Sequence, residues 1–416
     1  MLASTIMRDA HRAGIATDLL TPLGSLRRYS PDIGDVSLLG VAPPVEHPRV
    51  FATFTSLPAV SEVLSVSPGH VTGATARGNV TLYLAAPEHA GSALVWHTGS
   101  RRHTAQLQER ARVRGLILEN ARLISATGVA VPTPTEEALY GRLDLPFIPP
   151  ELREGEDEIA AGERGELPAL VSELDIRGDL HMHTMWSDGR DSVEDMVFAA
   201  QQLGYQYVAI TDHSERSLAS RRMSRADIPR QRREIEKIRH RVPGMEILHG
   251  IEVDIMHDGT LDFDDAQLDG FDIVLASLHD HCGHEPARLT ERYLRAIRHP
   301  LVNVITHPAN RSPARFDGYD IDFDRLFAAA AETGTAMEID GAPGHLDMDG
   351  ALARRAVAMG ATVAIDSDCH RSDALGRQMR FGLGTARRGW IQAADVLNAR
   401  AVDAVRDFIA RKRARR

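Results

Sequence analysis

Residues 179–188 read Asp-Leu-His-Met-His-Thr-Met-Trp-Ser-Asp, an apolar start followed by two histidines one residue apart. Successive side chains of a β-strand point to opposite faces, so a strand here would turn His181 and His183 toward one point. The turn-forming pair Asp188-Gly189 can bring a carboxylate back to the same place. Two imidazoles and a carboxylate suit a metal ion, although a lone His-x-His is more often a pair of hydrogen-bonded strand histidines. The residues downstream decide between these interpretations.

The composition is that of an ordinary globular protein. A chain of 416 residues, 43% hydrophobic and 25% charged, is long enough for two or three domains with their own cores. No signal-peptide pattern and no long uncharged apolar stretch is present, so we expect a cytoplasmic protein without membrane contact. The net charge of −10 argues against indiscriminate nucleic-acid binding but allows a local basic groove.

The first 145 residues predict a mixed α/β region. A helix is expected near Gly24-Ser25, strands at 33–39 and 79–84, and a helix at 101–114. This order resembles the palm and thumb of family X DNA polymerases, whose nucleotidyltransferase core carries Gly-Ser, Gly-Asp-x-Asp, a third Asp on the next strand, and a Thr-Gly-Ser turn. The resemblance implies an N-terminally truncated member, because the chain begins without room for the family's helix-hairpin-helix lyase domain.

The resemblance breaks at the catalytic carboxylates. Asp35 occupies the first position, but Ser37 and Thr81 stand where the family has its second and third Asp. Two-metal phosphoryl transfer needs several carboxylates to hold two cations close together, and one carboxylate cannot do this. We therefore predict a degenerate nucleotidyltransferase without polymerase activity; an active polymerase would need other carboxylates in place of Ser37 and Thr81.

The same region carries groups that can bind a DNA backbone. Thr98, Gly99 and Ser100 match the family's Thr-Gly-Ser turn and are candidate substrate-binding residues. Five arginines follow on the expected helix, and their alternative role is ordinary solubilising charge. These are Arg101, Arg102, Arg110, Arg112 and Arg114.

A change of composition separates this region from the rest. Residues 146–154 are Pro-rich and residues 154–158 are acidic, which predicts an extended linker with a solvated charge run. The segment 149–153, Pro-Pro-Glu-Leu-Arg, also matches the junction before the second domain of bacterial family X polymerases. The predicted domains are a polymerase-like palm and thumb at 1–145, a linker at 146–175 and a second domain at 176–416.

Strands and helices alternate in the second domain. Apolar β-branched runs lie at 207–210, 246–255, 271–278, 302–305, 335–339 and 362–365, and helices are expected at 192–203, 323–332 and 352–359. This alternation predicts a parallel sheet, and seven units closing on themselves predict a barrel. In such barrels the chemistry gathers at the carboxyl ends of the strands.

Six of the seven predicted strand ends carry His, Asp or Glu. Burying so many ionisable groups around one axis would be costly without a cation to compensate them. The candidates are His181, His183, Asp188, Asp212, His213, Glu252, His279, His307, Asp368 and His370.

This order of motifs resembles the PHP (polymerase and histidinol phosphatase) family, most closely the C-terminal exonuclease domain of bacterial family X polymerases. The resemblance runs from about residue 175 to residue 400. It implies an α/β fold, a distorted (β/α)₇ barrel after a smaller palm and thumb region, and a trinuclear metal site. In that site one ion would be held by His181, His183, Glu252 and Asp368, a second by Glu252, His279 and His307, and a third by Asp188, His213 and His370.

Residues beside these ligands have more specific predicted roles. Asp212 is expected to orient a ligand histidine rather than to bind metal. Arg311, in a His-Pro-x-x-Arg motif shared with the family, is expected to bind a substrate phosphate, with a surface salt bridge as the alternative. His281 and His284 either supply a general acid or belong to a surface loop. Glu338 is either an outer partner of the site or a strand end without chemistry.

The ligand set is rich in imidazole with some carboxylate, which favours Mn²⁺ or Zn²⁺, with Fe²⁺ also suitable, over Mg²⁺ or Ca²⁺. Such ions lower the pKa of bound water and stabilise a phosphorane-like transition state, so phosphate-ester hydrolysis is the expected reaction. Glu252, Asp212 and Arg311 are its predicted catalytic residues.

The family X setting implies a substrate as well as a reaction. It points to DNA, cut by a 3′-5′ exonuclease that also removes 3′-phosphates in repair. One alternative is a small-molecule phosphomonoesterase of the histidinol-phosphatase type. A third possibility is a DNA-binding repair accessory without catalysis, which the complete ligand set disfavours. The sequence does not indicate an oligomeric state.

Overall fold

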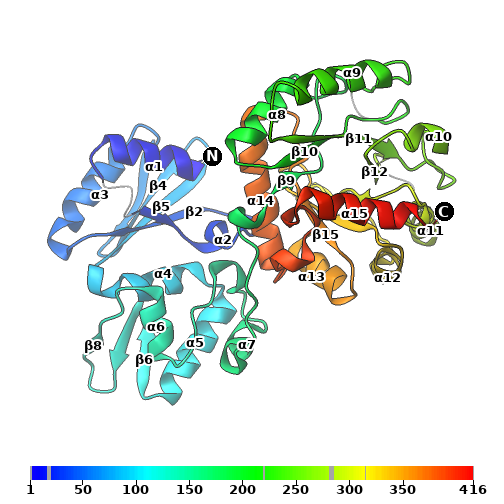
Figure 1. The fold of residues 1–416 in the computed structure, drawn as a ribbon. Helices are drawn as coiled ribbons and strands as arrows, with labels where there is room; N and C mark the ends of the chain where they lie inside the picture. Colours follow the sequence, from blue (N-terminus) through cyan, green and yellow to red (C-terminus); the bar gives the residue numbers. More distant parts are fainter. Residues whose placement is uncertain (1, 16–19, 219–220, 281–284, 314, 416) are drawn as a thin grey trace. The chain divides into compact units, whose positions relative to one another are not determined.

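The computed structural model describes residues 2–15, 20–218, 221–280, 285–313 and 315–415 (Figure 1). Contacts within the chain divide it into two compact units, residues 1–167 and residues 168–416. None of the described helices is long and apolar enough to cross a membrane.

The first unit is built on a five-stranded sheet with the strand order β1-β2-β5-β4-β3. β2 and β5 pair in parallel, which places Ser37 directly beside Thr81. Helices α1 (Leu2–Arg12) and α3 (His47–Thr55) pack on this sheet and bury Ile6 and Phe54 in a common apolar core with Leu38. The strands are β1 (Leu20–Pro22), β2 (Val36–Val41), β3 (Glu62–Ser67), β4 (His70–Thr75) and β5 (Gly78–Ala85).

A helical part with a small second sheet completes the first unit. The helices are α2 (Gly24–Arg27), α4 (Ala90–Thr98), α5 (Arg101–Val113) and α6 (Glu136–Arg142). The antiparallel sheet consists of β6 (Leu116–Glu119), β7 (Arg122–Ser125) and β8 (Ala130–Val131). The helices predicted near residue 24 and at 101–114, and the strands predicted at 33–39 and 79–84, are therefore present with ends shifted by a few residues.

The segment predicted as an extended linker is folded instead. It contains a 3₁₀ turn at Pro150–Leu152 and helix α7 (Glu158–Arg164), and the division between the two units lies at residues 167 and 168. The expected solvated charge run is also partly wrong, because Glu158 is buried and its carboxylate lies 2.7 Å from His103 Nδ1. A charged group can be buried when it is paired, and composition does not reveal a partner that is distant in sequence.

The second unit contains a seven-stranded parallel sheet whose strands follow one another in chain order. The first and last strands approach each other through a parallel bridge between Met182 and Cys369, so the sheet is a nearly closed barrel. The predicted α/β barrel is thus confirmed. Its strands are β9 (Gly178–Asp179), β10 (Tyr207–Ile210), β11 (Glu246–Asp254), β12 (Ile273–Ser277), β13 (Val304–Ile305), β14 (Ala336–Asp340) and β15 (Val363–Asp366).

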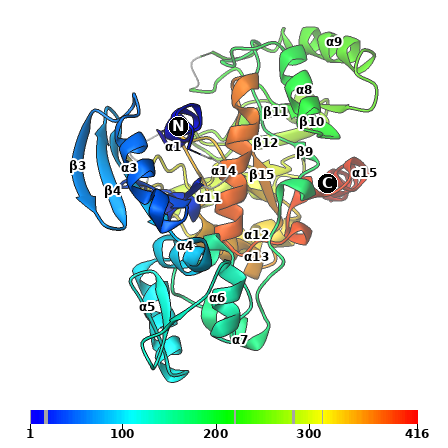
Figure 2. The same cartoon turned by 90° about the vertical axis from the view of Figure 1, so that its left-hand side faces the viewer.

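Helices surround this barrel (Figure 1), and Figure 2 shows α14 lying along it, against β15. α15 (Val402–Arg413) has a different place: Val405 and Phe408 join a buried cluster with the strand residues Leu248 and Ala336. α15 therefore covers the amino-terminal end of the barrel. The surrounding helices are α8 (Val193–Gln202), α9 (Ile228–Arg239), α10 (Asp265–Leu268), α11 (Pro286–Arg298), α12 (Phe323–Thr333), α13 (Gly350–Ala358) and α14 (Leu375–Arg388).

The inward-facing side chains of the barrel change from apolar to ionisable along the strands. Leu248 on β11 and Ala336 on β14 belong to the apolar cluster beneath the barrel. Glu252 and Glu338 lie an even number of residues further along the same strands, so they face the same interior. Both carboxylates are fully buried. The fold thus collects ionisable groups at the carboxyl ends of the strands, opposite α15.

Candidate metal centre

His181 and His183 lie just beyond the first strand, which is shorter than predicted. β9 ends at Asp179, but the bridge at Met182 continues the alternation, so both rings turn the same way. Their Nε2 atoms are 3.1 Å apart, and both side chains are fully buried. Two ring nitrogens this close need either a shared proton or a cation between them.

Glu252 on β11 lies at the centre of the histidines. Its Oε2 atom is 3.4 Å from His181 Nε2 and 2.8 Å from His213 Nδ1, and its Oε1 atom is 3.1 Å from His307 Nε2. Burial alone would raise the pKa of Glu252, but neighbouring imidazoles, His181 first and then His213 and His279, hold it well below its ordinary value. The carboxylate is therefore ionised and in contact with several rings at once.

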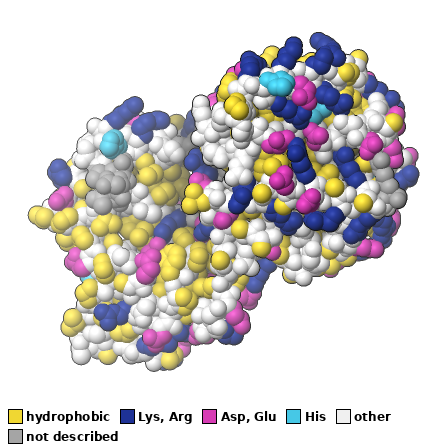
Figure 3. Space-filling view, in the orientation of Figure 1, with side chains coloured by type: hydrophobic (Ala, Val, Ile, Leu, Met, Phe, Trp, Pro, Cys, Tyr) yellow, Lys and Arg dark blue, Asp and Glu magenta, His cyan; other side chains and the backbone are white. Residues whose placement is uncertain are grey.

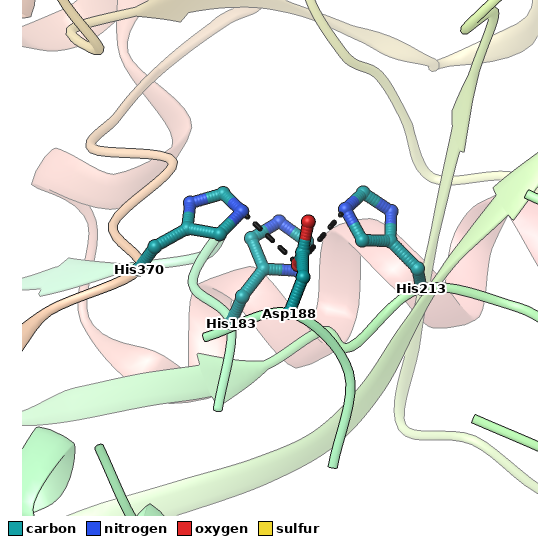
Figure 4. A group of neighbouring side chains, drawn as sticks. All are labelled: His183, Asp188, His213 and His370. Carbon is teal, nitrogen blue, oxygen red and sulfur yellow. Dashed lines mark ion pairs between the residues drawn. The ribbon is translucent and has the colours of Figure 1, made fainter. Parts of the chain in front are cut away.

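A second group forms around Asp188, as Figure 4 shows. Asp188 Oδ1 lies 3.4 Å from His213 Nε2 and 3.2 Å from His370 Nε2. The ring of His183 stacks on that of His213 and on that of His370, with centroid distances of 4.2 and 4.3 Å. The turn after the first strand thus returns Asp188 to the histidines, as its sequence predicts.

All nine predicted ligand side chains lie in one connected cluster. Asp368 Oδ1 is 3.0 Å from His183 Nε2, and the ring of His279 lies 4.9 Å from that of His213 and 5.4 Å from that of His307. Groups able to hold an ion overlap at His183 and His213. We call this set the nine-residue cluster: His181, His183, Asp188, His213, Glu252, His279, His307, Asp368 and His370.

Unpaired polar atoms in the cluster fit a bound cation. His213 Nδ1 and Glu252 Oε2 are 2.8 Å apart, yet neither makes a hydrogen bond with any described residue, and the same holds for Asp188 Oδ1. Burial, followed by the nearby His213 and His370, lowers the pKa of His183 to about 3, so this ring is neutral and has a free lone pair. Lone pairs aimed at one another are costly unless a metal ion lies between them.

Comparison with known proteins gives the family of the chain. The family model of the DNA polymerase beta thumb matches residues 93–154, and that of the PHP domain matches residues 179–339. The DNA polymerase/3′-5′ exonuclease PolX of Bacillus subtilis (strain 168) is 33% identical over 393 residues, which are 93% of this chain and 68% of that protein. The chain belongs to the PolX family.

Other relatives of this PolX-family chain match about half of its length. A probable phosphatase of Thermoanaerobacter sp. (strain X514) is 31% identical over 211 residues, 48% of this chain and 81% of that protein. A probable phosphatase of Syntrophotalea carbinolica is 28% identical over 211 residues, 48% of this chain and 83% of that protein. The second unit is therefore a phosphoesterase domain of the PHP type, a family that uses divalent metal ions.

The first unit of this PolX-family chain has one carboxylate at the three positions where two-metal nucleotidyl transfer needs carboxylates. Ser37 Oγ lies 3.3 Å from Asp35 Oδ2, and Thr81 Oγ1 lies 3.0 Å from Thr72 Oγ1. The three positions are neighbours, as the resemblance implies, but two of them carry hydroxyls. Neutral hydroxyls cannot replace the charge that two Mg²⁺ ions require.

The Thr-Gly-Ser turn is engaged within its own unit. Thr98 is buried and its hydroxyl accepts from Arg27 at 3.0 Å, while Ser100 caps α5 by accepting from the backbone of His103. Arg110, Arg112 and Arg114 bond to carboxylates of the same unit, and Arg101 and Arg102 have none among the described residues. Of the groups predicted to bind a DNA backbone, few therefore remain available, and these include Arg101 and Arg102 on α5.

Asp212 has a different role from the predicted one. Its carboxylate accepts from Thr184 N at 2.8 Å, Ser187 N at 3.0 Å and Gln231 Nε2 at 2.6 Å, and it makes no hydrogen bond to a histidine among the described residues. The prediction that it orients a ligand histidine is wrong in this respect. Asp212 instead fixes the turn that carries Asp188.

Two other carboxylates orient histidines of the cluster. Glu338 Oε1 lies 2.6 Å from His181 Nδ1, and Asp254 Oδ1 lies 2.8 Å from His279 Nδ1. From the sequence alone the role of Glu338 stays open, and Asp254 is not among the candidates. The alternation of β11 could have identified Asp254, since it lies two residues beyond Glu252 and so faces the same side.

Arg311 lies four residues beyond His307 and is mostly buried. Its backbone N–H donates to Asp347 at 3.2 Å, and its guanidinium lies 3.9 Å from Asp349. That long ion pair leaves guanidinium donors for a substrate. The predictions for His281 and His284 fall outside the described residues.

Proposed function

We propose that the nine-residue cluster holds three divalent ions, Mn²⁺ or Zn²⁺ with Fe²⁺ also suitable, and that the chain hydrolyses phosphodiesters from the 3′ end of DNA. The position of Glu252 is the main support, because one ionised carboxylate contacts His181, His213 and His307, and its Oε2 makes no hydrogen bond in the part of the chain that the structure describes. DNA as substrate is supported by the likeness to PolX over 93% of the chain.

The ligands are divided among the ions as the family resemblance implies. Bound divalent ions supply positive charge for the phosphate and activate water at neutral pH. The chain's own groups prepare them: Glu338 and Asp254 accept the Nδ1 protons of His181 and His279, which leaves Nε2 of each ring free to bind. The three proposed ligand sets are His181, His183, Glu252 and Asp368; Glu252, His279 and His307; and Asp188, His213 and His370.

Substrate binding is assigned to Arg311. A guanidinium can donate two parallel hydrogen bonds to phosphate oxygens, and its short distance in sequence from His307 keeps it near the ions. The face of the second unit seen in Figure 3 carries Lys and Arg side chains interspersed with Asp and Glu. That face is the one that carries α15, opposite the nine-residue cluster, so the attraction for a phosphate is assigned to the ions and Arg311.

A degradation assay tests the proposal. Purified protein with Mn²⁺ should shorten a 5′-labelled single-stranded oligonucleotide from its 3′ end, and His183→Ala should remove that activity. His240→Ala, a change at an exposed histidine on the end of α9, is the matched control and should keep full activity. A labelled deoxynucleotide should not be incorporated at a gapped duplex.

A small-molecule phosphomonoesterase is the second candidate, and the probable phosphatases that match the second unit favour it. The same preparations are therefore offered histidinol phosphate and nitrophenyl phosphate. Turnover of these esters with an intact oligonucleotide would reject DNA as the substrate. Degradation that survives His183→Ala would reject the metal site itself.

A further inference from the structure

The sixth strand end carries ionisable groups that none of the three proposed ions uses. Asp340 is the last residue of β14, and its Oδ1 accepts from the backbone of Ala342 at 2.6 Å. The chain then turns, with the N–H of His345 donating to Ala342 O at 3.0 Å. This turn brings the imidazole of His345 back over the strand end, where it stacks on His307 with ring centroids 5.1 Å apart.

Asp340 and His345 meet Asp368 from the next strand. One ligand atom from each of the three residues lies within 4.8 Å of the other two. No ion pair of 4.0 Å or less joins His345 to either carboxylate in the described part of the chain. Two ligands bound to one ion at about 2.0–2.2 Å lie roughly 3–4.4 Å apart, so this spacing suits a shared ion better than a direct hydrogen bond.

Buried atoms of this group lack partners. Asp340 is fully buried, and neither its Oδ2 atom nor His345 Nδ1 makes a hydrogen bond with the described residues. The neighbouring interior is already rich in negative charge, because Asp340 pairs in register with the buried Asp366 and lies two residues beyond the buried Glu338. A carboxylate in such a place is costly unless a cation compensates it.

We infer that Asp340, His345 and Asp368 hold a further divalent ion beside the nine-residue cluster. Two carboxylates and one imidazole form a more oxygen-rich ligand set than the cluster itself, which suits Mn²⁺. Asp368 belongs to both sites and couples them. The inference concerns an additional ion and holds whichever phosphate ester is cut.

Equilibrium dialysis against Mn²⁺ tests this inference. The chelated full-length protein is dialysed at several free Mn²⁺ concentrations, and bound manganese per chain is measured at saturation. His345→Ala and the nearly isosteric Asp340→Asn should each bind one ion fewer than the unchanged protein. His240→Ala should bind the same number as the unchanged protein.

Two results would overturn the inference: an unchanged manganese count in either variant, or a loss of two or more ions in either variant. The latter would show that the pair supports the nine-residue cluster rather than an ion of its own. Because the readout is a difference in bound metal, it does not depend on DNA hydrolysis. A protein that loses one ion in these variants but never degrades DNA would keep this inference and lose the proposed function.

Discussion

Glu338 Oε1 lies 2.6 Å from Nδ1 of His181, and both side chains are fully buried. The same carboxylate accepts the backbone N–H of His307 through Oε2 at 2.7 Å. One side chain on β14 therefore fixes the tautomer of one proposed ligand and the backbone position of another. This carboxylate belongs to the site although it holds no ion in the proposed scheme.

Replacing Glu338 should weaken metal binding. Glu338→Ala removes both acceptors, and the loss of such an outer partner typically lowers metal affinity by about 10–100-fold. Glu338→Gln keeps an oxygen for His181 but turns an amide toward the N–H of His307. Its metal affinity should therefore lie between that of the unchanged protein and that of Glu338→Ala. Competition with a chelating dye measures the affinity, and the exposed Glu332→Gln is the control. Equal affinity in Glu338→Ala and the unchanged protein would contradict this role.

Metal affinity should rise with pH up to about 9. Burial alone would lower the pKa of His279 and His370, but facing carboxylates, first Glu252 for His279 and Asp368 for His370, raise each to about 9 in the metal-free protein. Both rings are then protonated at pH 7 and must lose a proton to bind a cation. Because each ring belongs to a different proposed ion, the apparent affinity for each of these two ions should increase roughly 10-fold per pH unit between pH 7 and 8.5 and level off above pH 9.

Calorimetric titration in buffers of different ionisation enthalpy measures the protons released on Mn²⁺ binding. At least two should appear at pH 7.5, because facing carboxylates, against the effect of burial, also raise the pKa of His181 and His307; fewer should appear as the pH approaches 9.5. An affinity that levels off near pH 7, the range expected for ordinary histidines, would show that these two rings are not the ones that bind metal.

Asp212 should matter for stability and for the position of Asp188. Asp212→Ala leaves the buried donors of Thr184, Ser187 and Gln231 without an acceptor, and each unsatisfied donor costs about 1–3 kcal/mol. We expect a loss of about 3–5 kcal/mol in unfolding free energy and a lower metal content. Urea denaturation and metal analysis measure the two effects, with the exposed Asp320→Ala as control. Full stability in Asp212→Ala would remove its proposed role in fixing the turn.

The sequence predicts the parts of the site that depend on local periodicity. His181 and His183 could be recognised because side chains two residues apart point the same way even where the strand ladder has ended. The strand ends of the barrel could be ordered from alternating runs, which place His279 and His307 at the same end as Glu252. Local rules therefore suffice for the proposed ligands.

The partners of these ligands could not be predicted in the same way. His181 and Glu338 are 157 residues apart in sequence, and their hydrogen bond exists only once the barrel has formed. Asp212 directly precedes a proposed ligand, yet its hydrogen bonds depend on how the turn after β9 folds back. Glu158 shows the same limit in the first unit, because only the packing of α7 provides its contact with His103.

A buried ion network in the first unit gives the last prediction. Glu136 accepts two hydrogen bonds from Arg27, at 2.8 and 2.7 Å, and one from the fully buried Arg153 at 2.6 Å. Glu136→Ala leaves the Arg153 guanidinium buried without its carboxylate, which should lower the unfolding free energy by about 3–5 kcal/mol. The neighbouring Glu137 is exposed, so Glu137→Ala should change the unfolding free energy by less than about 0.5 kcal/mol. Urea denaturation of both variants provides the comparison, and equal stabilities would mean that the network contributes nothing. Because Glu136 lies in the first unit, metal content should stay unchanged in both variants, which separates this effect from those at the barrel.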